Sequence, residues 1–344
     1  MQEERTLYVA EQGATIAKTS HRIVIKNIDK KTIQEIPFFK VEQIIVIGRV
    51  NLTPDMIFSA FNREIDIVFV SRDGRFKGRL TRDNLRLVNL RRKQYERSGD
   101  NEFRLKIAKN IVAGKLKNQR TILMRYNRDK KADVAKEIIA MKISIDSIEK
   151  AQTIEALMGL EGIGARSYFS GLKCVLKQEL GFKERVKRPP KDPVNAMLSF
   201  GYTLLSIYVE SAVNVAGLDA YIGNLHAFED RRKSLVLDLM EEFRPVVVDS
   251  VILSAVNTLE ITGADFYTIE GCEGVFLTDG GRAKYIKALE RRFASEIKVK
   301  DEHDYSYRGL FKRQAMLYRK VVLGENIEYE PYLKNIDILP LYTE

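Results

Sequence analysis

The sequence predicts an α+β protein with a small, sandwich-like N-terminal β-sheet domain over residues 1–83 and a larger all-helical domain over residues 84–344. Short segments rich in valine and isoleucine, separated by turn-like residues, fill the first 80 residues, as is typical of strands. From about residue 84 onward, apolar residues instead recur every three or four positions, as is typical of helices. A chain of 344 residues, 45% of them hydrophobic, is long enough to bury a core in each domain.

The predicted β domain also contains one short helix and one hairpin. Thr53 can cap the helix, Pro54 suits its first position, and Asp55 is favourable near the positive end of the helix dipole. Asp73 and Gly74 form a tight-turn pair, which predicts a hairpin at the end of the domain. The predicted strands are "TLYVA" (6–10), "HRIVIKN" (21–27), "VEQIIVIG" (41–48) and "EIDIVFVS" (64–71).

The second domain shows helical periodicity on both sides of one loop. Phe103, Ile107 and Ile111 are spaced four residues apart and predict the apolar face of an amphipathic helix. The basic, proline-rich segment "VKRPPKDP" (186–193) interrupts this pattern and predicts a loop, followed by a helix with Asp192 as its cap.

The positive charge of the chain is concentrated in one region. The formal net charge is +10, but residues 72–136 contain 21 Lys or Arg and 7 Asp or Glu, a local balance of +14, so the remaining residues sum to −4. A concentrated basic surface indicates a polyanionic partner, most often nucleic acid. The alternative is a solvated helix face that only aids solubility.

Cysteine usage and hydropathy limit the class of protein. The chain has two cysteines, Cys174 and Cys272, too few for a disulfide framework or a cysteine-based zinc site, and both are expected to be small core residues. We find no apolar run of the ~18 residues needed to span a bilayer, and the N-terminus lacks the pattern of a signal peptide. A cytoplasmic protein without membrane association is therefore expected.

A glutamate interrupts the apolar face of a predicted helix in "TIEALMGLEGIGARSYF" (153–169). Glu161 falls in the apolar stripe, and Gly162 and Gly164 beside it remove side-chain bulk, which allows another backbone or a phosphate to approach closely. A buried carboxylate needs a partner, and a lysine or arginine elsewhere in the chain is an open alternative to a functional role. The other residues of the stripe are Ile154, Leu157, Met158, Ala165 and Tyr168.

Carboxylates also interrupt the apolar run "SLVLDLMEEFRP" (234–245). Ser234 can cap a helix in which Asp238 and Glu241, three residues apart, are neighbours on one face. A divalent cation would offset their repulsion, and an imidazole with one more glutamate would complete a ligand set suited to Mg²⁺ or Mn²⁺. The alternatives are an exposed acidic turn, above all for Glu242, and a structural role for His226.

Several motifs together resemble a known family. The segments "MGLEGIGARSYF", "DPVNAMLSFGYTLL", "GLDAYIGNLHAF" and "SLVLDLMEEFRP", with "LYVAEQGATIAK" near the N-terminus and "VFLTDGGRAKYIKALERRF" near the C-terminus, are similar to the CRISPR-associated integrase and endonuclease. Members of that family are the catalytic subunit of the spacer-acquisition (adaptation) complex. The resemblance covers nearly the whole chain and implies that the helical domain is the catalytic one.

The resemblance also implies the residues and the reaction. Glu161, His226 and Glu241 match the family's metal ligands, and Asp238 matches a further catalytic acid that assists the site. The implied activity is a metal-dependent DNA endonuclease and integrase, in which the 3′-hydroxyl of a short DNA fragment attacks a phosphodiester at a CRISPR repeat. The implied cofactor is Mg²⁺ or Mn²⁺, and the implied partners are double-stranded DNA fragments, CRISPR repeat DNA, a second copy of the chain and a smaller adaptation protein.

Two departures from the family pattern and two rival functions remain open. Arg231-Arg232 stands where the family usually has Gly-Arg, which affects the loop conformation because arginine avoids positive φ. Asn224 replaces a residue that is usually large and apolar, so the packing behind His226 is expected to differ. The main rival is a general metal-dependent nuclease that acts on branched or damaged DNA, and the other is a non-catalytic DNA-binding scaffold. The basic segment 72–136, with Lys187, Arg188 and Lys191, is expected to contact the DNA backbone in each case.

Overall fold

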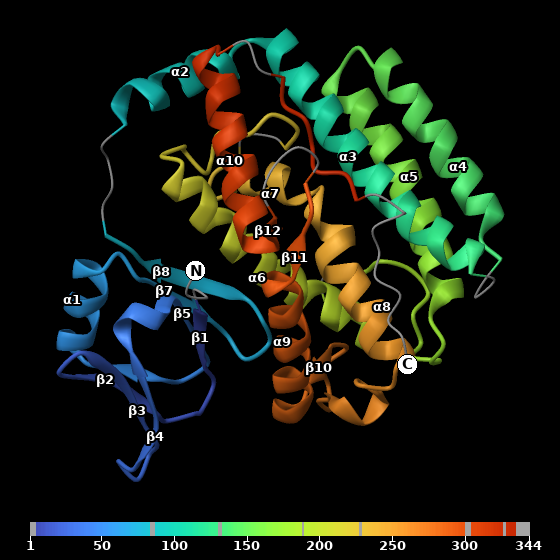
Figure 1. Ribbon diagram of the computed structural model, residues 1–344. Helices are drawn as coiled ribbons and strands as arrows, with labels where there is room; N and C mark the ends of the chain where they lie inside the picture. Colours follow the sequence, from blue (N-terminus) through green and yellow to red (C-terminus); the bar gives the residue numbers. More distant parts are fainter. Residues whose placement is uncertain are drawn as a thin grey trace. The chain divides into compact units, whose positions relative to one another are not determined.

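The computed structural model describes residues 5–82, 87–129, 133–187, 189–226, 229–299, 304–325 and 328–334. The chain divides into two compact units, Met1–Asn84 and Leu85–Glu344. Figure 1 shows strands in the first unit and mainly helices in the second. The predicted α+β fold class, a β-sheet region followed by a larger helical region, is confirmed.

Two four-stranded sheets form the described part of the first unit. In one sheet, with strand order β1-β5-β7-β8, the first three strands are parallel and β8 is antiparallel to β7. In the other, with order β4-β3-β2-β6, neighbouring strands are antiparallel except for the parallel pair β2 and β6. The strands are β1 (Arg5–Val9), β2 (Thr15–Thr19), β3 (Arg22–Lys26), β4 (Thr32–Pro37), β5 (Val41–Ile47), β6 (Asn51–Leu52), β7 (Asp66–Val70) and β8 (Phe76–Leu80).

One hydrophobic core joins both sheets and the helix α1 (Pro54–Asn62). The side chains point inward from alternate strand positions, as the period of two residues in a strand requires. Buried core residues include Leu7, Ile44 and Ile67 from the first sheet, Ile16, Ile23 and Ile25 from the second, and Met56 and Ala60 from α1.

The local sequence signals of the first unit were mostly interpreted correctly. Thr53 caps α1 by accepting a hydrogen bond from the Met56 N–H at 3.3 Å, and Pro54 is its first residue. The β7–β8 hairpin closes at Gly74, whose φ is +83°. The four predicted strands correspond to β1, β3, β5 and β7, whereas β2, β4 and β6 were missed. The strand β4 is mostly exposed and so lacks the apolar run that marks a strand in the sequence.

Helices make up most of the second unit (Figure 1). They are α2 (Val88–Ser98), α3 (Asn101–Arg128), α4 (Ala135–Ser147), α5 (Ile154–Val175), α6 (Pro193–Val215), α7 (Ser234–Met240), the π-helix η3 (Arg244–Asp249), α8 (Ser250–Asn257), α9 (Asp279–Ala294) and α10 (Tyr307–Leu323). Two short antiparallel strand pairs also occur, β9 (Phe266–Thr268) with β10 (Val275–Leu277), and β11 (Glu296–Ile297) with β12 (Tyr305–Ser306).

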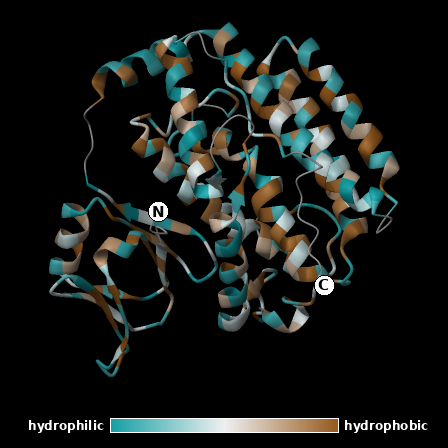
Figure 2. Cartoon of the chain, viewed as in Figure 1, coloured by the Kyte–Doolittle hydropathy of each residue, from teal (hydrophilic) through white to brown (hydrophobic). Residues whose placement is uncertain are grey.

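The helix α6 is a core helix of this unit. Asp192 caps it by accepting from the Asn195 N–H at 2.8 Å, as predicted. By length and composition α6 could cross a membrane, with a mean hydropathy of 1.3 over its best window, so the expectation that no such apolar run exists is wrong. However, 72% of that window is buried inside the structure. Figure 2 shows α8 as another largely hydrophobic helix, and five of its eight residues are buried.

Both cysteines lie on the surface, so the expectation that they are core residues is wrong. Cys174 is near the end of α5, on the face of the helix that turns away from the core, and Cys272 lies in the connection between β9 and β10.

The close packing of α3 against α5 depends on two glycines. A Cβ on Gly164 would lie 2.7 Å from Leu116 Cδ2, and a Cβ on Gly171 would lie 2.6 Å from Leu123 Cδ1. Both the glycines and the leucines are spaced by two helical turns, so the contact repeats along the pair. This contact places Lys115 of α3 beside Glu161 of α5.

Gly164→Ala is expected to destabilise the protein by about 1–3 kcal/mol, because the added methyl group overpacks a filled interface. Gly162→Ala is the matched control, since Gly162 is exposed on the same helix and its Cβ would meet open space. The control should stabilise the protein by up to ~1 kcal/mol through helix propensity. Urea unfolding followed by circular dichroism measures the free energy of unfolding of both variants. Equal changes in this free energy for Gly164→Ala and Gly162→Ala would contradict the packing described here.

Candidate active site

Asp238 fixes the loop that precedes α7. Its side chain is fully buried, and its Oδ2 accepts from the backbone N–H groups of Asn224 and Leu225, the latter at 3.0 Å. Its Oδ1 accepts from the His226 N–H at 3.1 Å and lies 2.6 Å from His226 Nδ1. A Cβ on Gly223 would lie 2.8 Å from Asp238 Oδ2, so only glycine lets the loop wrap so closely around this carboxylate.

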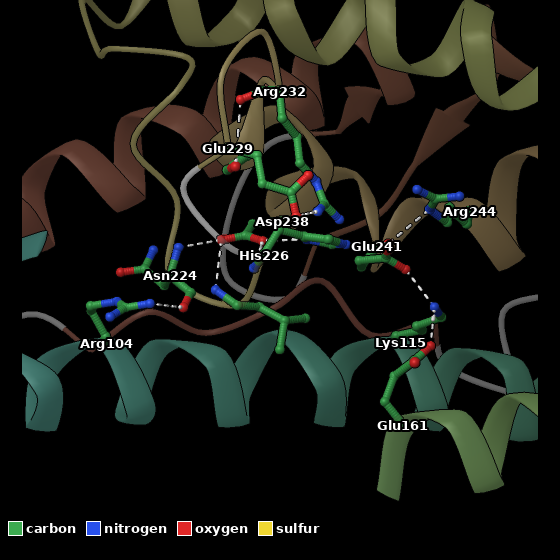
Figure 3. Close-up of polar contacts among 12 residues, drawn as sticks. Arg104, Lys115, Glu161, Asn224, His226, Glu229, Arg232, Asp238, Glu241 and Arg244 are labelled. Atoms are coloured by element: carbon green, nitrogen blue, oxygen red, sulfur yellow. Dashed lines mark hydrogen bonds and ion pairs between the residues drawn. The ribbon is translucent and has the colours of Figure 1, made fainter. Parts of the chain in front are cut away.

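This arrangement orients the His226 ring (Figure 3). With Nδ1–H donated to Asp238, the neutral ring carries its lone pair on Nε2, which lies 4.0 Å from Glu241 Oε1. The imidazole thus lies between Asp238 and Glu241, where the sequence analysis placed a divalent cation. The interpretation of those two acids as a pair that shares an ion is wrong, because Asp238 turns toward the loop backbone.

Glu241 is the residue that follows α7, and its side chain is only 5% exposed. Lys115 Nζ lies 2.6 Å from its Oε2, and Arg244 Nε lies 3.1 Å from its Oε1. Burial alone would raise the pKa of Glu241, but Arg244, Lys115 and His226 together lower it to about 2. The carboxylate is therefore held ionised in the protein interior.

Glu161 reaches the same point from α5. Lys115 Nζ lies 2.5 Å from Glu161 Oε1, so the ammonium group bridges Glu161 and Glu241 (Figure 3). Because Glu161 Oε1 and Glu241 Oε2 contact the same nitrogen, the distance between these two oxygens cannot exceed the sum of the two N–O distances, 2.5 and 2.6 Å. The alternative left open by the sequence, an ion pair between Glu161 and a lysine, is thus present in the structure. The structure also brings Glu161, Glu241 and His226 together from three separate segments.

The side-chain donor atoms of Glu161, Glu241 and His226 are of the kind that binds a divalent metal, although the Lys115 ammonium group lies between the two carboxylates. Among the described residues, no three of His, Cys, Asp and Glu have the arrangement of a metal site. Two carboxylates and one imidazole nitrogen are nevertheless an oxygen-rich set of the kind that suits Mg²⁺ or Mn²⁺.

A buried aspartate that the sequence analysis missed lies beneath Arg244. Asp249 accepts hydrogen bonds from Tyr202 Oη at 2.7 Å and from Tyr168 Oη at 2.9 Å, and burial raises its pKa to about 6. The Arg244 guanidinium lies over the Tyr202 ring, 4.6 Å from its centroid. The π-helix η3 carries both Arg244 and Asp249, in keeping with the frequent occurrence of such turns at functional sites. The sequence signal that could have identified Asp249 is its position as a lone acid in the apolar run "RPVVVDS".

Glu242 is buried, not exposed, so its interpretation as part of an exposed acidic turn is wrong. Tyr329 Oη donates to its Oε1 at 3.3 Å, and the Tyr332 N–H donates to its Oε2 at 3.0 Å. Burial raises the pKa of Glu242 to about 8. Tyr329 and Tyr332 belong to residues 328–334, which we call the C-terminal strap; the sequence of this segment has no periodic pattern that would have placed it here.

The two departures in the loop have structural consequences. Arg231 adopts a φ of +66°, in the left-handed region that favours the glycine usual in the family, at a cost of about 1 kcal/mol or more. Asn224 is buried and its Nδ2 donates to Tyr318 Oη at 3.0 Å, so a hydrogen bond replaces the expected apolar packing. Ser234 is the first residue of α7, not its cap, because Lys233 occupies the N-cap position.

Some of the predicted basic residues form ion pairs within the chain. Lys106 pairs with Glu328 at 2.6 Å and Lys191 with Glu273 at 2.9 Å. Partial desolvation, Arg244 and Lys115 lower the pKa of Lys187, although its side chain is exposed. Arg188 lies outside the described residues.

Comparison with known families identifies the chain. The model of the family "CRISPR associated protein Cas1" matches residues 7–291, most of the sequence. The chain belongs to the Cas1 family. The family predicted from the sequence motifs is thereby confirmed.

Relatives of similar length support the assignment to Cas1. The CRISPR-associated endonuclease Cas1 3 of Thermus thermophilus is 34% identical over 334 residues, covering 96% of this chain and 95% of the relative. The CRISPR-associated endonuclease Cas1 2 of Rhodospirillum rubrum is 34% identical over 340 residues, covering 95% and 97%. These names agree with the expected class of enzyme, a nuclease.

Solved structures share the fold. A Cas1 protein from Thermotoga maritima matches with a TM-score of 0.80 and 28% identity, over 95% of this chain and all of that one. A casposase bound to an integration product matches with a TM-score of 0.87 over 98% of this chain and 96% of that one. At 19% identity, the second match shows a common fold alone.

The raised pKa of Glu242 predicts a pH-dependent stability. Between its ordinary value of 4.5 and about 8, the folded protein binds more protons at this group than the unfolded chain does. The contribution of Glu242 to folding therefore becomes less favourable as the pH rises through this range. Glu242→Gln should stabilise the protein at pH 8, with a gain that shrinks toward pH 5, in urea unfolding at several pH values.

Glu241→Gln provides the contrast, because its pKa is lowered and its ionised form stabilises the fold above pH 4.5. This variant should be less stable than the parent at neutral pH, and the loss should shrink as the pH falls toward 2. If the difference in free energy of unfolding between Glu242→Gln and the parent did not change with pH, the assigned burial of the Glu242 carboxyl group would be contradicted.

Proposed function

We propose that the chain is a metal-dependent DNA endonuclease and integrase of CRISPR adaptation, which joins the 3′-hydroxyl of a short DNA fragment to a phosphodiester at a CRISPR repeat. The observation that carries this proposal is the convergence of Glu161, His226 and Glu241. These residues come from α5, from the loop before α7 and from the end of α7. Glu161 and Glu241 both contact the ammonium group of Lys115, and His226 Nε2 lies 4.0 Å from Glu241 Oε1.

The proposed roles follow from the contacts. Glu161, Glu241 and His226 Nε2 would hold Mg²⁺ or Mn²⁺, which supplies polarisation of the phosphodiester and activation of the attacking hydroxyl when bound. Asp238 orients the imidazole through Nδ1 and acts as a positioning residue. Arg244 keeps Glu241 ionised and holds its carboxylate in place through the ion pair at 3.1 Å.

The proposed partners rest on charge and on the family. The excess of +14 in residues 72–136 supports binding of the DNA backbone independently of sequence. We propose that the chain assembles with a smaller adaptation protein, which is supported by one structural neighbour, described as a Cas6-RT-Cas1–Cas2 complex. We also propose that two copies of the chain take part, as the resemblance to the family implies. The proposed place of action is the cytoplasm, where CRISPR repeat DNA is accessible.

The proposal is tested by strand transfer of a short duplex into a plasmid that carries repeat DNA, with Mg²⁺, Mn²⁺ or EDTA. Glu161→Gln, His226→Ala and Glu241→Gln should each reduce transfer by at least about a thousandfold, because each removes a ligand of the reacting centre. Asp238→Asn should cost less, about 10–100-fold, as is usual for a residue that orients a ligand.

Two controls separate the rival functions. A fragment with a blocked 3′ end should be inert in transfer, whereas a general nuclease that uses water would cut DNA whether or not this fragment is blocked. Binding of labelled duplex should survive the three ligand substitutions, which distinguishes loss of chemistry from loss of a DNA scaffold. Transfer by Glu161→Gln at the parental rate would overturn the proposed site.

A further inference from the structure

We propose that Lys115 is a built-in cation that occupies the centre of the site, and that a divalent metal must displace it, so that metal and DNA bind cooperatively. This inference rests on the proposed function, because it concerns the regulation of that same site. It assigns to Lys115 a role that is separate from those of the acids and the histidine.

The first argument is the position of the ammonium group. Lys115 Nζ lies 2.5 Å from Glu161 and 2.6 Å from Glu241, and its side chain is only 13% exposed. It therefore makes short contacts to one oxygen of each carboxylate that the metal would use (Figure 3). Two cations cannot occupy this place at the same time.

The second argument is charge. Lys115 and Arg244 together already balance the charges of Glu161 and Glu241. A divalent ion added to this cluster would leave two excess positive charges in a poorly solvated interior, which is strongly unfavourable. Departure of the ammonium group lowers this excess, and the lysine side chain is long and flexible enough to move. Because the ammonium is tethered to α3, it competes with free metal at every metal concentration.

The third argument concerns the anion that receives the displaced ammonium group. The charged groups that interact with Lys115 include the acids Glu241, Glu161 and Asp249 and the cations Arg244 and Lys187. Glu161 and Glu241 are the acids that the metal would take, and the buried Asp249 carboxylate already accepts hydrogen bonds from Tyr168 and Tyr202. Among the described residues named here, no acid is left to receive the ammonium group, and the phosphate of bound DNA has the required chemistry. By linkage, a phosphate that attracts Lys115 strengthens metal binding, and metal strengthens DNA binding by the same factor.

The primary test is the affinity of DNA-free protein for Mn²⁺, measured by electron paramagnetic resonance or calorimetry. Lys115→Met should bind Mn²⁺ at least about tenfold more tightly than the parent, within the range of typical site couplings. Lys117→Met is the matched control, since Lys117 is exposed on the same helix and the charge change is identical, and it should leave the affinity unchanged. Unchanged or weaker binding by Lys115→Met would overturn the inference.

Two further variants separate the possible failures. Lys115→Arg keeps the positive charge and should bind Mn²⁺ no more tightly than the parent; a gain equal to that of Lys115→Met would contradict the charge argument. Glu161→Gln in the Lys115→Met background should remove the tight binding. Tight binding that persists would place the metal elsewhere and overturn the proposed site, as would a failure of both parent and Lys115→Met to bind Mn²⁺.

Thermal unfolding and DNA binding provide independent readouts. Mn²⁺ should raise the melting temperature of Lys115→Met more than that of the parent. The same unfolding measurement shows whether the variant folds. The parent should bind a labelled, 3′-blocked duplex more tightly in Mn²⁺ than in EDTA at constant ionic strength, and Lys115→Met should lose most of this enhancement. An enhancement of equal size in parent, Lys115→Met and Lys117→Met would show that Lys115 does not couple the two ligands.

Discussion

Three buried carboxylates at one end of α7 each require a partner, and the partners that they find tie the site together. Asp238 binds the backbone of the preceding loop and the His226 ring. Glu241 pairs with Lys115 and Arg244. Glu242 accepts hydrogen bonds from the C-terminal strap. Because a buried carboxylate that loses its partner costs about 3–5 kcal/mol, the loop, α3, η3 and the strap are all held against α7 by these contacts.

The helix α3 is the common support of these contacts. Its Asn118 donates to the backbone oxygens of Glu242 and Tyr332, both at 2.8 Å, and accepts from the Lys334 N–H at 2.9 Å. A Cβ on Gly114 would lie 2.5 Å from Pro331, so this glycine lets the strap pass close to the helix. Lys115 follows directly and points at the two glutamates. One stretch of α3 therefore holds the strap on one side and the proposed catalytic acids on the other.

Local signals in the sequence predicted much of the fold. The caps at Thr53 and Asp192, the Gly74 hairpin and the change from strand to helix periodicity depend on neighbouring residues, and the structure has each of them. The edge strand β4 was missed because its exposure removes the apolar pattern. The helix α6 was predicted from its cap, but its apolar length was not recognised because polar residues are scattered along it.

The site was harder to predict, because its partners are distant in the sequence. Acids in apolar stripes marked Glu161 and Glu241 as unusual, but sequence alone did not tell which of 21 basic residues in the segment 72–136 turns inward to meet them. The surroundings of Asp238 and Glu242 were predicted less well, since both carboxylates accept hydrogen bonds from backbone N–H groups. Such groups exist at every residue and leave no mark in the sequence. The metal itself remains a proposal, supported by the donor atoms.

The location of the bound metal tests the central claim most directly, and iron-mediated cleavage of the polypeptide measures it. Fe²⁺ loaded in place of Mg²⁺ and treated with ascorbate and peroxide cuts the chain next to the ion, and mass spectrometry identifies the cut positions. The account predicts cuts close to Glu161, His226 and Glu241, suppressed by excess Mg²⁺ and absent in Glu161→Gln. Cuts confined to other segments, or cuts at these positions that persist unchanged in Glu161→Gln, would contradict it.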